Sequence, residues 1–306
     1  MNFRRAFTLL ELLVVIAIIA ILAALLFPVL SRAKQRAQGV QCLNNGKQMM
    51  TAIFLYTSEN NEFFPPNPDD GNSIPGYNWC SGQAGDQPDD DQDEFNPDVL
   101  KDPKLSLLIN YLGGNVSVFR CPADMRQGLY SGTDPALKGK IVPAARTFSM
   151  NQAVGTIDQQ YDVTGHGGGH GGIPNLSVNG PWLNNQDNHR RNSPWYTYGK
   201  STDIHAPSPS SLWVLLDEDA NGLNDAAFAF GMQEAIWYDA PGTYHNGGCG
   251  FAFADGHSET HGWLSKGEKG NNGTGVADDA DYQDWLWMQQ RTSADSTGIM
   301  KTPPPP

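Results

Sequence analysis

The chain has 306 residues, of which 39% are hydrophobic, and a net charge of −13. The charge is unevenly divided: residues 1–50 hold six of the 20 Lys and Arg and one of the 33 acidic residues, which leaves 14 basic and 32 acidic side chains and a net charge of −18 for the rest. So acidic a body argues against binding of nucleic acid. Its size suits one sizeable globular domain, or a domain with large insertions.

The N-terminus joins a basic pair to a long apolar segment. Arg4 and Arg5 precede sixteen unbroken apolar residues, Leu12 to Phe27. A helix from Phe7 to Leu30 would be roughly 36 Å long, enough to span the hydrocarbon core of a bilayer. The basic pair predicts that the N-terminus lies in the cytoplasm. Glu11 has no use in a plain membrane anchor, because a carboxylate in hydrocarbon costs several kcal/mol unless it is paired.

The stretch Phe7 to Glu11 (Phe-Thr-Leu-Leu-Glu) at this offset resembles the class III signal of type IV prepilins and type II secretion pseudopilins. The resemblance implies cleavage by a prepilin peptidase between Ala6 and Phe7 and methylation of the new amine. It also implies that Glu11 pairs with the N-terminus of a neighbouring subunit during assembly. Ala6 departs from the Gly that is usual before the cleavage site. The alternative is an ordinary signal anchor.

The rest of the chain can be divided into segments from its sequence pattern. Pro28 is expected to kink the helix, and an apolar stripe then continues it as an amphipathic helix over residues 31–60. Residues 61–290 are expected to form the globular domain, with a long insertion at 155–203 and a disordered Pro-rich tail at 291–306. The expected elements of the domain are a helix at 104–112, strands at 116–120, 146–150 and 211–216, a hairpin of strands at 250–254 and 257–261, and a helix at 279–290.

A second motif lies in the last quarter of the chain. His245 is followed, after nine residues, by Asp255-Gly256. This resembles the signature of the prepilin-type processing-associated H-X9-DG proteins, whose C-terminal domains are of the DUF1559 type. Further matches occur at 42–45, 119–124, 149–151 and 209–211.

The two resemblances together imply an α+β, pilin-like fold, in which a long N-terminal helix packs on a small antiparallel sheet with long loop insertions. They imply a structural subunit, not an enzyme: a prepilin or pseudopilin of a type II secretion or type IV pilus-like filament. Such a subunit crosses the bacterial inner membrane once, with its domain in the periplasm. It then assembles with itself or with other pilin-like subunits, in the periplasm or on the cell surface. The competing hypotheses are a membrane-tethered periplasmic binding protein and a surface adhesin that use the prepilin signal for export.

The H-X9-DG residues permit a structural and a catalytic interpretation. Gly256 supplies the positive φ of a tight turn, and the side chain of Asp255 can bond backbone amides there. His245 can anchor the Gly-rich loop before the strand by bonding a backbone or Asp oxygen. We therefore expect a structural clasp, with a metal or acid–base site that includes nearby histidines as the alternative.

Carboxylate and amide oxygens at alternate positions predict a calcium site. Asp217, Asp219 and Asn221 have the spacing with which a calcium loop begins, and Asp225 can complete the set. Phe228 stands where an EF-hand would have its bidentate Glu. A solvated turn is the alternative, and calcium is the one cofactor that the sequence suggests.

The four cysteines are widely spaced and form no Cys-x-x-Cys pair, which argues against a zinc finger or a redox motif. In an oxidising compartment an even number suggests two disulfides, and four cysteines allow three pairings. We expect Cys42 to pair with Cys121 and Cys80 with Cys249. Free buried thiols are the alternative.

Overall fold

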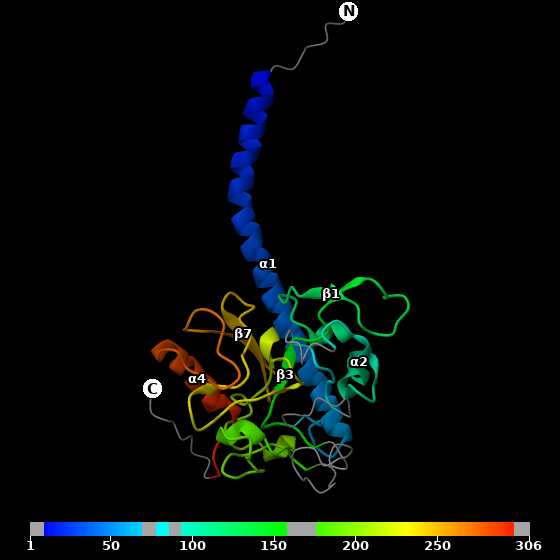
Figure 1. Ribbon diagram of the computed structural model, residues 1–306, viewed down its shortest axis with the longest axis vertical. Helices are drawn as coiled ribbons and strands as arrows, with labels where there is room; N and C mark the ends of the chain where they lie inside the picture. The colour runs from blue at the N-terminus through cyan, green and yellow to red at the C-terminus, as the bar shows by residue number, and fades with distance from the viewer. Residues whose placement is uncertain (1–8, 69–77, 86–92, 158–175, 297–306) are drawn as a thin grey trace, which may run out of the picture.

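The computed structural model describes residues 9–68, 78–85, 93–157 and 176–296. One long helix, α1 (Leu9–Glu59), projects from a globular body, and its C-terminal half runs into that body (Figure 1). The structure is thus of the α+β class, with a long N-terminal helix packed on a sheet, as expected. The predicted leader, residues 1–6, lies outside the described residues.

α1 consists of two halves with opposite surroundings. The large apolar side chains from Leu9 to Leu30 are exposed, whereas the buried residues of the helix begin at Cys42 and continue to Thr57. By length and composition the first half could cross a membrane. Pro28 lies inside the helix, which continues to Glu59 and curves gently (Figure 1).

The central sheet has five strands in the order β5-β3-β4-β7-β8. Neighbouring strands are antiparallel except for β3 and β5, which are parallel, so the sheet is mixed and not purely antiparallel. The strands are β3 (Phe148–Asn151), β4 (Trp213–Asp217), β5 (Ala227–Phe228), β7 (Gly248–Phe253) and β8 (Ser258–Gly262).

Short elements surround this sheet. Two further sheets have two strands each: β1 (Gln127–Leu129) with β2 (Ile141–Pro143), and β6 (Ile236–Trp237) with β9 (Thr274–Gly275). Among the described residues the remaining α-helices are α2 (Asp98–Lys101) and α4 (Asp279–Thr292). The same residues contain the short 3-10 helices η1 (Leu107–Asn110), η2 (Val116–Phe119), η3 (Pro181–Asn184), η4 (Ser201–Asp203) and η5 (Ala220–Gly222).

The helix expected at 104–112 is only the 3-10 helix η1, and two further expectations about the secondary structure also differ from what is observed. The strand expected at 116–120 is the 3-10 helix η2, because the side chain of Asn115 accepts a hydrogen bond from the backbone N–H of Ser117 and caps a helical turn. The ordered chain also extends past residue 290. α4 ends at Thr292, and Asp295 is buried and forms a β-bridge with Trp195.

β7 lies between α1 and α4. Its sequence, Gly-Cys-Gly-Phe-Ala-Phe, combines small residues with large aromatic ones. Successive side chains of a strand point to opposite faces of the sheet. Phe251 faces α4, where its ring lies 4.9 Å from that of Trp287. Ala252 faces α1. If Gly46 of the helix had a Cβ, that atom would lie 3.3 Å from the Cβ of Ala252. The small residues of β7 therefore let α1 approach the sheet closely.

Because Gly46 sits at this closest approach, we expect Gly46→Leu to lower the melting temperature of the full chain in detergent. Overpacking of this kind typically costs about 1–3 kcal/mol. The control is Lys47→Leu, which adds an apolar side chain at an exposed position of the same helix. Equal melting temperatures for the two variants would mean that α1 does not pack closely on β7.

The contact of β8 with α4 predicts a pH dependence. The ring of His261 stacks on that of Trp287, with centroids 3.7 Å apart. Burial lowers the pKa of His261 to about 4, with Asp284 opposing the shift and Arg291 and Lys269 adding to it. The unfolded chain has a histidine pKa of about 6.5, so it binds the proton more readily than the folded chain does.

We therefore expect the free energy of unfolding to decrease as the pH falls from about 6.5 to about 4, and His261 to account for part of that decrease. Denaturant titrations at several pH values should give a shallower dependence in this window for His261→Gln than for the unchanged chain. Parallel curves for the two proteins would show that His261 does not titrate with a lowered pKa.

Candidate functional site

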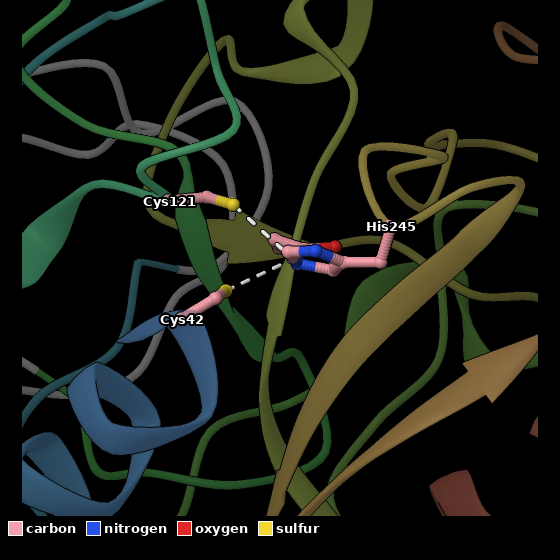
Figure 2. A group of neighbouring side chains, drawn as sticks. Cys42, Cys121 and His245 are labelled. Atoms are coloured by element: carbon pink, nitrogen blue, oxygen red, sulfur yellow. Dashed lines mark hydrogen bonds and ion pairs between the residues drawn. The ribbon is translucent and has the colours of Figure 1, made fainter. Parts of the chain in front are cut away.

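Four polar side chains from separate parts of the chain meet beside α1. Cys42 lies on the helix, Cys121 follows η2, Asp217 ends β4, and His245 stands in the loop before β7. One ligand atom from each of the four lies within 4.8 Å of the others, and in the described part of the chain this is the one such group of His, Cys, Asp and Glu. Figure 2 shows the two sulfur atoms and the imidazole of His245 pointing toward one another. We refer to these four residues as the Cys-Cys-His-Asp cluster.

The cluster is held by short contacts. His245 Nε2 lies 2.7 Å from Asp217 Oδ2 and 3.4 Å from the sulfur of Cys121. The thiol of Cys42 donates to Asp217 Oδ2 at 3.4 Å. The backbone N–H of Gly250 donates to the other oxygen of the carboxylate, Oδ1, at 3.1 Å. The side chains of His245 and Asp217 are 4% and 0% exposed, so these contacts are sheltered from water.

The two thiols differ in acidity. The hydrogen bond between the sulfurs, together with burial and the charge of Asp217, raises the pKa of Cys42. The same bond and the proximity of His245 lower the pKa of Cys121, although burial opposes the shift. Burial alone would favour a neutral imidazole, but the hydrogen bonds to Asp217 and Cys121 outweigh it and raise the pKa of His245 to about 10. The cluster thus favours negative charge on Cys121 and positive charge on the neighbouring His245.

Glycines leave room around the cluster. A Cβ on Gly250 would lie 3.1 Å from Asp217 Oδ2, 3.3 Å from the sulfur of Cys42 and 3.6 Å from His245 Nε2. A Cβ on Gly39 of α1 would lie 3.6 Å from His245 Nδ1, a buried nitrogen for which the structure shows no hydrogen-bond partner. His245 is also one of the residues that line a cavity of about 720 Å³, together with Arg32 and Arg36 of α1.

The other end of the H-X9-DG motif is a hairpin turn between β7 and β8, as expected. Asp255 Oδ1 accepts a hydrogen bond from the backbone N–H of His257, and Gly256 has a φ of +91°. A Cβ on Gly256 would stand 2.8 Å from the ring of Phe54 on α1. His245 Nε2 contacts a carboxylate oxygen of Asp217 at the opposite end of β7, and the structural role of the motif stays a prediction. The motif therefore lies beside α1 at both ends of the strand.

We expect Gly256→Val to destabilise the fold by about 1 kcal/mol or more, because a β-branched residue is strained at positive φ and its Cβ would press on Phe54. The matched control is Gly262→Val on β8, where an added Cβ meets no atom within 4 Å. Thermal unfolding of the full chain in detergent measures both. A Gly256→Val chain as stable as the control would show that the turn does not need glycine.

The structure does not bring the predicted calcium ligands together. Asp217 belongs to the Cys-Cys-His-Asp cluster, and Asp219 accepts hydrogen bonds from the backbone and side chain of Asn221 at the start of η5. Asp225 accepts a hydrogen bond from the backbone N–H of Ala227. Alternate positions bring oxygens together only in a loop that wraps around an ion. Here β4 ends at Asp217 and directs its carboxylate toward β7.

Neither predicted disulfide is formed, and all four cysteines are free, buried thiols. Cys42 and Cys121 are neighbours, as their predicted pairing required, but both also contact polar atoms of the cluster. Cys249 donates to the backbone oxygen of Asp217, and Cys80 to that of Ser81. Burial raises the pKa of both of these thiols, that of Cys80 to about 12, which keeps them protonated and unreactive.

The predicted processing site, Ala6 and Phe7, lies outside the described residues, whereas Glu11 is exposed in the first turn of α1. The sequence singled out every member of the Cys-Cys-His-Asp cluster, but for three different purposes: a disulfide, a calcium loop and a hairpin clasp. No local signal links the four residues, because they stand 79, 96 and 28 positions apart in the chain.

The comparisons with known proteins bear on the N-terminus. Residues 1–27 match the family model of the prokaryotic N-terminal methylation motif. No curated protein and no solved structure matches the chain. Together with the exposed apolar half of α1, the motif supports a precursor of the type IV pilin or pseudopilin kind that is anchored in a membrane by its N-terminal helix and processed by a prepilin peptidase.

Proposed function

We propose that the chain is a structural subunit of a filament of the type II secretion or type IV pilus kind. In this proposal the precursor lies in the bacterial inner membrane with its globular domain in the periplasm. It is cleaved between Ala6 and Phe7 and then assembles with copies of itself or with other pilin-like subunits. The observation that carries the proposal is the match of residues 1–27 to the methylation motif, at the start of a helix whose large apolar side chains from Leu9 to Leu30 are exposed.

The exposed half of α1 supports assembly on physical grounds. Every large apolar side chain that the structure describes from Leu9 to Leu30 is at least 46% exposed. Each buried apolar side chain of this size is worth about 1.5–3 kcal/mol, so the segment must be covered by lipid or by other protein. A bilayer covers it before extraction. Afterwards the same face can only be covered by helices of its own kind, which favours a filament core made of α1.

Glu11 fits this proposal in position and in charge. It lies in the first turn of α1, among the exposed apolar residues. In a dry core a carboxylate is stable only when it is paired, and the amine of Phe7 in a neighbouring subunit would offer the opposite charge at the same level of the bundle. The proposal therefore assigns Glu11 a role in assembly and not in cleavage.

We expect mass spectrometry or N-terminal sequencing of the mature protein to find Phe7 at the N-terminus, with one added methyl group. Cleavage after Ala23 or Ala24, as by an ordinary signal peptidase, would contradict the proposal.

We further expect Glu11→Gln to be cleaved normally but to be lost from the filament fraction sheared from cells, because only the charge is removed. Glu259→Gln, which removes the charge of an exposed carboxylate on β8, is the matched control and should assemble normally. A Glu11→Gln chain recovered in sheared filaments at the level of the control would show that the charge pair is not needed.

A further inference from the structure

We propose that the Cys-Cys-His-Asp cluster binds one zinc ion, or a divalent ion of the same thiophilic class, which ties α1 to the globular domain. The ligands are the sulfurs of Cys42 and Cys121, Nε2 of His245 and Oδ2 of Asp217. Filament assembly does not require this site, so the inference stands apart from the proposed function.

The donor set suits this ion. Zinc takes thiolate, imidazole and carboxylate ligands in a tetrahedron, with bonds of about 2.3 Å to sulfur and about 2.0–2.1 Å to nitrogen. Calcium and magnesium prefer oxygen ligands alone, and two thiolates exclude them here. Four protein ligands that fill the tetrahedron leave no position open for a substrate, so the ion would be structural and not catalytic.

Three of the six distances between ligand atoms can be compared with those of a tetrahedron, and the other three are at most 4.8 Å. With such bond lengths, ligand atoms lie about 3.3–3.8 Å apart. The sulfur of Cys42 is 3.4 Å from Asp217 Oδ2, and that of Cys121 is 3.4 Å from His245 Nε2. Nε2 and Oδ2 are 2.7 Å apart, the length of a hydrogen bond. When the ion replaces the proton between them, these two atoms must separate by about half an ångström.

The surroundings keep the position clear and orient the ligands. The backbone N–H of Gly250 holds the carboxylate of Asp217 through Oδ1, which leaves Oδ2 for the ion. Gly250 itself lacks the Cβ that would crowd two of the four ligand atoms, Asp217 Oδ2 and the sulfur of Cys42. Nδ1 of His245, the nitrogen that would not bind the ion, is buried beside Gly39 of α1, where a Cβ would lie 3.6 Å away.

Binding of the ion would displace any proton on the two sulfurs and the proton between His245 Nε2 and Asp217 Oδ2. Its consequence would be mechanical. Cys42 is the first buried residue of α1, at the level where the helix enters the body. The other three ligands come from three separate segments of the body. One ion would thus fasten the projecting helix at its exit from the domain, where any force on the filament core would act first.

The test uses the full chain, purified in detergent with a thiol reductant, freed of metal by a chelator and titrated with Zn²⁺ or Co²⁺. We expect one ion per chain by elemental analysis. The Co²⁺ form should show a thiolate-to-metal charge-transfer band and the intense visible bands of tetrahedral coordination. Removal of zinc by the chelator should lower the melting temperature, because an ion that binds only the folded chain stabilises it.

Variants locate the site. Cys42→Ser and Cys121→Ser should each weaken Zn²⁺ binding by at least about tenfold, whereas Cys80→Ser, which alters a buried thiol outside the cluster, should leave it unchanged. Gly250→Ala changes no ligand and should also weaken binding, because its Cβ crowds the ion. If a cysteine variant fails to fold, the spectrum of the Co²⁺ form of the unchanged chain still decides the question.

Three results would overturn the proposal: a reduced chain that binds no zinc, a Co²⁺ form without the charge-transfer band, and equal loss of binding in Cys80→Ser. A fourth would be recovery of Cys42 and Cys121 as a disulfide from cells lysed directly into an alkylating agent, because a disulfide leaves no thiolate for the ion.

Discussion

The close packing of α1 on β7 is the contact on which the remaining structure depends. Gly46 on the helix faces Ala252 on the strand, and Gly250 faces Cys42. These small residues bring the helix axis close enough to the sheet for both ends of the H-X9-DG motif to contact it. From Cys42 to Phe54 the helix rises about 18 Å, and the six residues of β7 span about 20 Å. The two ends of the motif thus lie at the two ends of the segment over which β7 packs on α1.

The two halves of α1 have different roles, and the packing on β7 involves only the C-terminal half. From Cys42 onward the side chains of α1 complete the core of the body, whereas from Leu9 to Leu30 they are exposed and apolar. A helix fastened firmly at one end can present the other end to a membrane or to neighbouring helices without disturbing the domain. The Cys-Cys-His-Asp cluster lies at the boundary between the two halves, which is where such a fastening is most useful.

The sequence predicted those elements that have a strong local signal. The apolar helix, the buried strand that became β4, the hairpin around Asp255-Gly256 and the terminal helix α4 are all present. Each of these elements is determined by a local feature of the sequence: a hydrophobic periodicity of 3.6 or of two residues, or a glycine that adopts a positive φ. The expected strand at 116–120 failed because one local contact, the cap by Asn115, decided a segment with no clear periodicity.

The Cys-Cys-His-Asp cluster could not be predicted from local patterns in the sequence. The spacing of Asp217, Asp219 and Asn221 says that three oxygens are close in the chain, but not that β4 directs the first of them toward β7 while the others cap a turn. The predicted pairing of Cys42 with Cys121 was correct in placing the two residues side by side, but they form no disulfide in the structure. The sequence does not show that His245 and Asp217 lie at the same place. Only the tertiary arrangement of four segments reveals a common site.

Hydrogen exchange on the mature chain in detergent tests most directly whether α1 and the sheet form one unit. Elements that open together exchange with the same free energy. The packing described above predicts that the amides from Cys42 to Thr57 of α1 and those of β7 exchange equally slowly, and that Gly46→Leu speeds both together. Fast exchange of this half of the helix beside a protected β7 would mean that the helix is only loosely attached, and would contradict the account.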